Sequence, residues 1–257
     1  MARTSLLWWI IALTLVTLMF LSLYPAFSTD ITQSRHMLEG FPSQLRAAMG
    51  MSLDIFSNFL GYYAYIFTYI GLAGAVQAMN LGLTMLGRET TSRTTDFLLT
   101  KPVTRTRVFV AKLASALAVL VITNSILIAI TLLLTIMFSV GSFSLCGFAL
   151  LALSFFLVQL VFLGLGILLS QLLKRVKSVV AVSLSAAFAF FSIGMIQAMT
   201  SDQKLRYLTP FKYFDHLAVV RDNTYEPKFV ILTFVVIFLA TATGYIIYRT
   251  RDARTMA

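Results

Sequence analysis

The chain has 257 residues, of which 59% are hydrophobic and 12% are charged, and its mean hydropathy is +0.88. A soluble protein of this size needs far more polar surface, so the composition excludes a soluble globular domain and predicts a multi-pass membrane protein. The formal net charge of +10 does not predict a nucleic-acid partner here, because lysine and arginine collect at the cytoplasmic edges of membrane proteins.

Six apolar segments follow one another along the chain, and each is long enough to cross a bilayer as a helix. Backbone groups find no water in lipid, so each segment is predicted to be helical. The predicted spans are about 6–24, 59–86, 108–138, 143–173, 178–199 and 229–248. The sequence therefore predicts an all-α membrane protein with six transmembrane helices, in which residues 1–257 form a single transmembrane domain.

Two long segments between the spans mix charged and aromatic residues. They cover residues 25–58 and 200–228. This mixture suits short helices that lie at the membrane surface, and it suits ordinary ordered loops equally well. The histidines His36 and His216 fall in these segments and are interpreted as interfacial side chains rather than ligands.

The second span contains small residues at a spacing of four. Gly71 with Ala75, Gly74 with Ala78, and Ala78 with Gly82 each form such a pair. Small residues at this spacing let two membrane helices approach closely, so this span is predicted to pack tightly. The single cysteine, Cys146, excludes an internal disulfide and is interpreted as a small apolar filler in the fourth span.

The stretch 87–107 separates the second and third spans and is the most polar part of the chain. It contains five basic residues, two acidic residues and seven threonines. A short amphipathic helix over 89–100 is one interpretation, and a solvated connector that sets topology is the other. Pro102 disfavours helix at the residue before it, and Thr104 is placed to cap the next helix, whose first turns carry Arg105 and Arg107.

The charges assign the two sides of the membrane. With the N-terminus inside, thirteen of the twenty lysine and arginine residues lie on the inner side, and seven of the ten acidic residues lie on the outer side. The positive-inside rule therefore predicts that both termini and the stretch 87–107 are cytoplasmic.

The spans lack the residues that drive other classes of membrane protein. No Asp, Glu, Lys, Arg or His occurs in the six apolar cores, when the third is counted from Leu113, so no proton relay is available at membrane depth. The chain contains no His-Glu-x-x-His, Gly-x-Ser-x-Gly or Gly-Lys-Ser/Thr motif. We expect no catalytic, metal or cofactor site in this chain. Energy for uphill transport would then have to come from a partner.

The stretch 87–107 resembles the first cytoplasmic loop of ABC-2 type permeases, the membrane subunits of bacterial ABC exporters. In that family an acidic residue precedes Gly-Thr-x-Glu-x-Leu-Leu, then x-x-Pro-Val-Ser-Arg and a lysine. The matching residues here are Glu89, Thr94, Asp96, Leu98, Leu99, Pro102, Val103, Thr104, Arg105 and Lys112. Arg93 replaces the usual glycine, and Asp96 replaces the longer acid. The segment 207–215, YLTPFKYFD, is similar to the family's segment before its last span.

This resemblance implies the ABC-2 type exporter fold and a place in an ATP-driven complex at the bacterial plasma membrane. Two permease subunits, identical or homologous, would pair above two copies of an ATP-binding subunit that holds the ATP and Mg. The cargo implied is an amphipathic compound, a peptide or a lipid. The residues implied to contact the ATP-binding subunit are Glu89, Arg93, Thr94, Asp96, Phe97, Leu98, Leu99, Pro102 and Arg105. An ion-gradient-driven transporter and a non-transporting sensor or scaffold remain as alternatives.

Overall fold

The computed structural model describes residues 2–25, 36, 38–51, 58–91, 104–138, 143–173, 176 and 178–250, with side chains outside 2–4 and 86–91. These residues are almost entirely helical, and no strand occurs among them. The elements are α1 (Ala2–Leu21), α4 (Ser43–Met49), α5 (Phe59–Thr91), α7 (Arg105–Met137), α8 (Leu145–Leu172), α9 (Val179–Thr200), α10 (Gln203–Arg206), the 3-10 helix η2 (Pro210–Lys212), α11 (His216–Asp222) and α12 (Pro227–Thr250).

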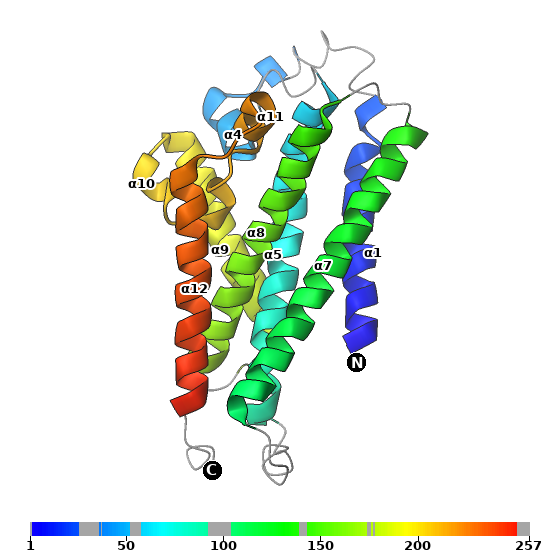
Figure 1. The fold of residues 1–257 in the computed structure, drawn as a ribbon. Coiled ribbons are helices and arrows are strands. Elements are labelled where there is room, and N and C mark those ends of the chain that lie inside the picture. Colours follow the sequence, from blue (N-terminus) through cyan, green and yellow to red (C-terminus); the bar gives the residue numbers. More distant parts are fainter. Residues whose placement is uncertain are drawn as a thin grey trace.

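The long helices run up and down the molecule side by side, as Figure 1 shows. Five of them are long and apolar enough to cross a membrane: Phe59–Met85, Arg105–Met137, Leu145–Leu172, Val179–Thr200 and Pro227–Thr250. Each overlaps one of the predicted spans. The apolar helix Ser5–Leu21 in α1 is shorter, so the count of six spans stays a prediction.

Polar side chains fix where several helices begin. Thr104, Ser144 and Ser178 stand at the N-caps of α7, α8 and α9, and the hydroxyl of each accepts a bond from a backbone N–H of the first turn. Such caps satisfy N–H groups that have no partner inside the helix. The Thr104 cap was predicted from the sequence and is confirmed. Cys146, in the first turn of α8, is exposed, so it does not pack inside the described bundle.

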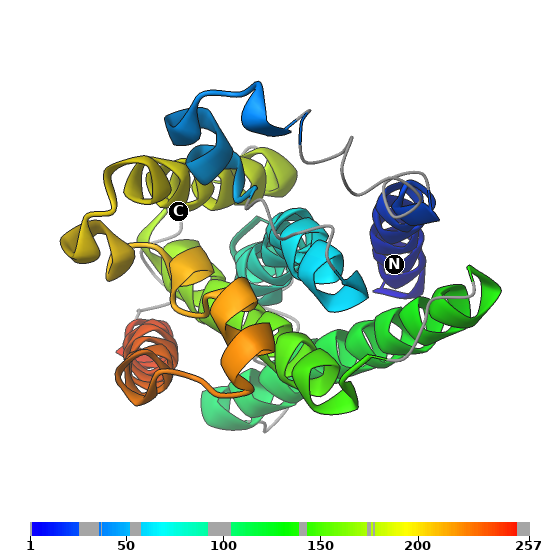
Figure 2. The same ribbon diagram turned by 90° about the horizontal axis from the view of Figure 1, so that it is seen from above.

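The helices α5 and α8 form the centre of the bundle, and the other long helices surround them (Figure 2). Glycines bring the two central backbones together. A Cβ atom on Gly166 would lie 2.6 Å from the Met79 carbonyl oxygen, and one on Gly82 would lie 2.8 Å from the Ile167 nitrogen. Gly71 faces open space. The predicted close packing of this span therefore occurs around Gly82.

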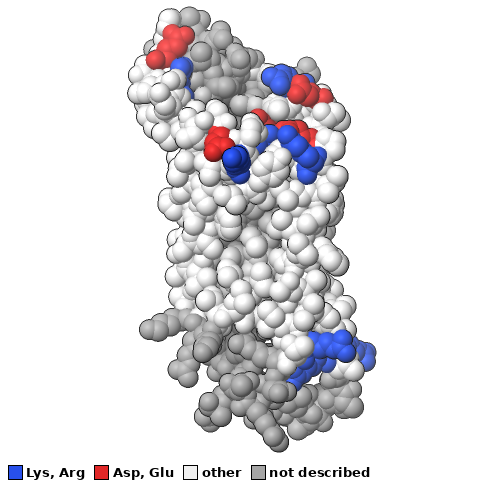
Figure 3. All heavy atoms as spheres, turned by 90° about the vertical axis from the view of Figure 1, so that its left-hand side faces the viewer, with Lys and Arg blue, Asp and Glu red and all other residues white. Residues whose placement is uncertain are grey.

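Charged residues sit at the two ends of the molecule. Figure 3 shows a face with an uncharged band between a mixed acidic and basic upper end and a basic lower end. The start of α1 and the end of α12 lie at the lower end, together with the end of α5 and the start of α7 (Figure 1). The short helices α4, α10 and α11 gather at the opposite end. These short helices agree with the first of the two interpretations of segments 25–58 and 200–228.

Candidate functional site

The stretch 87–107 is described only in part. Its first residues, through Thr91, continue α5, so the backbone of Glu89 belongs to the end of that helix rather than to a separate one. The other expected contact residues, apart from Arg105, lie outside the described residues: Arg93, Thr94, Asp96, Phe97, Leu98, Leu99 and Pro102. Their predicted contact with an ATP-binding subunit therefore stays a prediction.

Arg105 is described, and its guanidinium lies at the end of α12. Its Nη1 atom is 3.5 Å from the Tyr248 carbonyl oxygen and 3.4 Å from the Arg249 carbonyl oxygen. Carbonyls in the last turn of a helix lack intrahelical partners and carry the negative end of the helix dipole. A cation at this position is therefore favourable, and it joins the first turn of α7 to the last turn of α12.

Two further contacts extend this junction between α7 and α12. The Thr106 hydroxyl is 2.8 Å from the Tyr245 hydroxyl. The buried Phe109 ring packs against Tyr245 and Tyr248, with centroids 5.0 Å and 6.1 Å apart. One turn further along α7, Lys112 Nζ donates to the Met85 carbonyl oxygen of α5 at 2.8 Å. The beginning of α7 is thus bonded to both α12 and α5.

A second polar group lies deep among the long helices. Gln77 of α5 donates from Nε2 to the Thr123 hydroxyl of α7 at 3.0 Å. Gln159 of α8 donates to Gln77 Oε1 at 3.2 Å and accepts from Asn124 Nδ2 of α7 at 2.6 Å. These four buried residues form a neutral network that joins α5, α7 and α8.

The chemistry of the described interior is neutral. Every buried polar residue there is a Gln, Asn, Ser or Thr, and no charged side chain is buried. No group of His, Cys, Asp and Glu suited to a metal ion occurs among the described residues. These residues can bond to one another and to neutral polar groups, and they offer neither a nucleophile with its base nor a proton relay.

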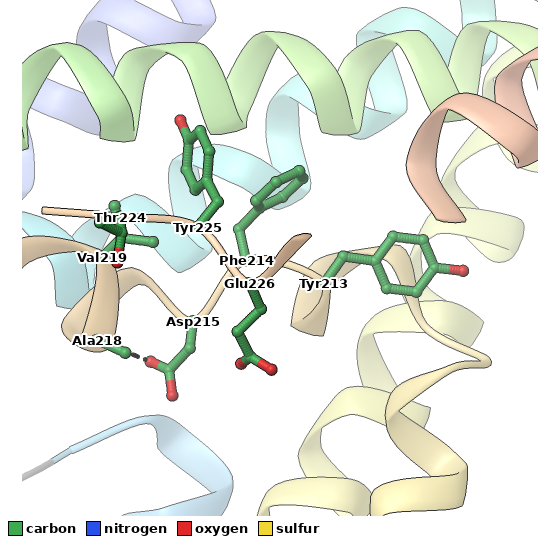
Figure 4. A pocket seen from close by; sticks show the side chains of 8 residues that line it. All are labelled: Tyr213, Phe214, Asp215, Ala218, Val219, Thr224, Tyr225 and Glu226. Atoms are coloured by element: carbon green, nitrogen blue, oxygen red, sulfur yellow. Dashed lines mark hydrogen bonds between the residues drawn. The ribbon is translucent and has the colours of Figure 1, made fainter. Parts of the chain in front are cut away.

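The segment that connects α9 to α12 lies toward the upper end of the molecule in Figure 1. Arg206 and Lys228 both pair with Glu226, and the Tyr225 hydroxyl donates to the Leu150 carbonyl of α8. Figure 4 shows a small hollow beside these residues, lined by Tyr213, Phe214, Asp215, Ala218, Val219, Thr224, Tyr225 and Glu226. Its volume of ≈ 20 Å³ suits about one water molecule, so this hollow does not hold an organic cargo.

His216 and Glu226 are among the ionisable groups of this segment whose pKa values are shifted. Burial lowers the pKa of His216 to about 4, although Asp215 opposes the shift, so the imidazole is neutral at pH 7. Its ring packs edge-on against Phe67. For Glu226, burial would raise the pKa, but hydrogen bonds from Arg206 and Lys228 outweigh burial and hold the pKa below its usual value. His216 is thus a packed side chain rather than a proton donor at neutral pH.

A model of the ABC-2 family transporter proteins matches residues 1–253. The chain belongs to the ABC-2 family. It is therefore a membrane permease of the ABC transporter class, and membership of this family implies that it works with an ATP-binding subunit. No curated protein matches the chain.

Sequence reasoning about this ABC-2 permease did not predict the contacts between the polar residues of its spans. Gln77, Asn124 and Gln159 are neutral residues of three apolar segments, and the structure brings them together. The junction between α7 and α12 was not predicted at all. Tyr245 and Tyr248 near the end of an apolar span, with Thr106 and Phe109 near the start of another, were the signals available.

Proposed function

We propose that this chain is the membrane-spanning subunit of an ATP-driven exporter at the plasma membrane. It carries an amphipathic compound, a peptide or a lipid outward, with ATP hydrolysed on a separate subunit. The match to the ABC-2 family over residues 1–253 is the observation that carries this proposal. The neutral interior of the described spans supports it, because an ion-driven transporter usually keeps ionisable side chains at membrane depth.

The proposed assembly contains two permease subunits, identical or homologous, and two ATP-binding subunits beneath them. Each permease subunit crosses the membrane six times, with α1 as the first span and both termini in the cytoplasm. The alternation of helix directions in Figure 1 supports an even number of crossings, because both helical ends of the chain lie at the same end of the molecule. The chain itself has no catalytic site in this proposal, and the stretch 87–107 receives the motion of the ATP-binding subunit.

Transport by inside-out membrane vesicles tests this function. The chain is produced together with the ATP-binding subunit, and uptake of labelled amphipathic compounds, peptides and lipids is measured with and without ATP. We expect uptake that needs ATP and persists after an ionophore collapses the ion gradients. The control carries a substitution of the Walker A lysine of the ATP-binding subunit. Uptake that follows an ion gradient and ignores this substitution would contradict the proposal.

A further inference from the structure

The central helix α5 keeps one accessible face, although its neighbours enclose most of it. The residues of this face follow one another at spacings of three or four positions, so they lie on one side of the helix. Val76 and Asn80 are 6% and 9% exposed, and the other members are partly exposed. We call this face the α5 stripe, and its members are Tyr65, Tyr69, Ala73, Val76, Asn80 and Thr84.

The helices α1 and α9 lie on the two sides of α5 (Figure 2). Both contact the α5 stripe at Tyr69, whose ring stacks on Phe20 of α1 with centroids 5.4 Å apart and lies 6.3 Å from the Phe191 ring of α9. The low exposure of Val76 and Asn80 places this part of the stripe below the surrounding surface. A slender molecule can reach such a surface, whereas a whole helix, about 10 Å wide, would rest on the flanking helices.

The polar groups of the α5 stripe differ in their partners. The Tyr65 and Tyr69 hydroxyls are 3.4 Å apart, and Tyr69 donates to the Met49 carbonyl oxygen at 3.2 Å. The Thr84 hydroxyl donates to the backbone carbonyl oxygen of Asn80 at 2.8 Å. The side-chain amide of Asn80, in contrast, has no hydrogen bond to the described chain, although this residue is almost buried within an apolar span.

An unpaired amide inside an apolar span is costly, because lipid tails offer it no hydrogen bond. Gln77, one turn away on the same helix, avoids this cost through its bonds with Thr123 and Gln159. Asn80 lies outside that network, and its amide keeps a carbonyl acceptor and two N–H donors. Polar side chains held at membrane depth often mark the path of a transported molecule. The partner that the Asn80 amide lacks is therefore a polar group from outside the chain.

We propose that the Asn80 amide binds an uncharged polar group of the cargo, such as an amide, an ester or a hydroxyl, while the apolar body of the cargo lies along the α5 stripe. This inference rests on the proposed function, and it adds the residues that contact the cargo and the class of its polar group. The polar group is uncharged because the interior of the described spans holds no buried charged side chain to neutralise a charge. A site that hydrogen-bonds its ligand discriminates strongly against a ligand that lacks the bonding group.

An unfolding measurement separates this role from a structural one. Asn80→Leu removes an amide that has no partner in the described chain, so we expect the thermal midpoint of the permease in bicelles to stay equal or to rise. Gln159→Leu, which breaks the buried network, should lower that midpoint. A fall for Asn80→Leu as large as the fall for Gln159→Leu would show a structural partner and would overturn the inference.

A second permease subunit is the alternative source of the missing partner. Analytical ultracentrifugation in detergent compares the dimer fraction of the wild-type chain with that of Asn80→Leu. We expect equal dimer fractions, because the amide faces the cargo rather than another subunit. A several-fold loss of dimer in Asn80→Leu would assign the amide to subunit pairing and would overturn the inference.

Photolabelling with dodecanamide that carries a diazirine at the end of its chain tests the site directly. The full-length permease in lipid nanodiscs is irradiated with this probe, and labelled peptides are identified by mass spectrometry. We expect labels on peptides of α5, reduced about five-fold or more by Asn80→Leu and largely kept by Asn80→Gln, because only the leucine variant loses the hydrogen bond. The matched control is Gln197→Leu: Gln197 is also 9% exposed but lies in the last turn of α9, and its replacement should leave the labelling unchanged.

Competition tests the class of the polar group. Unlabelled dodecanamide should reduce the labelling of α5, whereas dodecylammonium, with a charged group on a chain of the same length, should compete about five-fold less strongly. Equal competition by the two compounds would overturn the assignment of an uncharged group. Absence of label on α5 in the wild-type chain, or equal labelling of the wild-type chain and Asn80→Leu, would overturn the site.

The labelling needs neither ATP nor the ATP-binding subunit, so it separates this inference from the proposed function. Labelling that depends on Asn80, without ATP-dependent uptake in the vesicle experiment, would contradict the proposed function and support the site. ATP-dependent uptake that is equal in the wild-type chain and Asn80→Leu would support the proposed function and overturn the site.

Discussion

Gln77, Asn124 and Gln159 lie in an apolar bundle, where each side-chain amide would be costly without a partner. They satisfy one another instead, with Thr123 as the fourth member. Asn124 also donates to the Leu120 carbonyl of its own helix at 2.8 Å, which fixes the orientation of its amide. The network therefore sets the relative positions of α5, α7 and α8 at one depth of the bundle.

Replacing Gln159 by leucine should destabilise the chain. The substitution removes two interhelical hydrogen bonds and leaves Asn124 and Gln77 with unmet groups, at a cost of about 1–3 kcal/mol in the free energy of unfolding. Unfolding in bicelles, followed by circular dichroism, measures this cost. Gln77→Leu combined with Gln159→Leu should cost less than the sum of the single changes, because the two residues share one network. The control is Gln197→Leu, outside the network, and equal costs for Gln159→Leu and Gln197→Leu would contradict this account.

Among the helices, the crossing of α5 and α8 organises the whole bundle. Their backbones meet at Gly82 and Gly166, where the neighbouring atoms belong to backbone rather than to flexible side chains. Backbone atoms cannot rotate away from an added methyl group, so the crossing tolerates nothing larger than glycine. The central position of α5 and α8 in Figure 2 follows from this close contact.

Substitution of Gly82 by alanine should move α5 away from α8. The added Cβ would lie 2.9 Å from the Gly166 carbonyl carbon, which predicts a loss of about 1–3 kcal/mol in the free energy of unfolding. Gly71→Ala is the control on the same helix, because a Cβ there meets no atom within 4 Å. That control should leave stability unchanged or slightly raised, since alanine favours helix. Equal changes in the free energy of unfolding for Gly82→Ala and Gly71→Ala would contradict this account.

The helices show which features of the fold could be predicted from the sequence. Long apolar runs predicted the helices at 59–86 and 178–199 closely, because bilayer length and backbone hydrogen bonding leave few alternatives. The contacts between helices could not be predicted from the sequence. Gln77 and Gln159 are 82 residues apart in the chain, and nothing local specifies that their amides face each other. The same holds for Arg105, because its place in the loop motif does not predict that α12 ends beside its side chain.

The whole molecule has a basic lower end and a mixed acidic and basic upper end, separated by an uncharged band (Figure 3). The described cations near the lower end are Arg105, Arg107, Lys112 and Arg249. Acidic residues of the described chain, such as Asp215 and Glu226, lie in the segment between α9 and α12, toward the other end. This asymmetry favours the basic end in the cytoplasm, because basic residues next to the spans are retained there.

Labelling of single cysteines tests that orientation. Cys146 is exposed in the first turn of α8, at the end of the molecule that is predicted to face outward, so a membrane-impermeant maleimide should label the wild-type chain in intact cells. The variant Arg107→Cys in a Cys146→Ser background carries its thiol at the inner end and should be labelled only after the cells are permeabilised. The reverse pattern, or equal labelling of both in intact cells, would contradict the predicted orientation.

The central claim is that the stretch 87–107 passes the energy of ATP hydrolysis to the spans. The ratio of ATP molecules hydrolysed to molecules transported tests this claim most directly. The variants are Glu89→Lys, Asp96→Lys and Leu98→Asp, and the control is Glu39→Lys, which reverses a charge in an outer segment. We predict that the three loop variants stay in the membrane but lose transport at least ten-fold relative to ATP hydrolysis, while the control keeps the wild-type ratio. Unchanged transport and unchanged association with the ATP-binding subunit in all three loop variants would contradict the account.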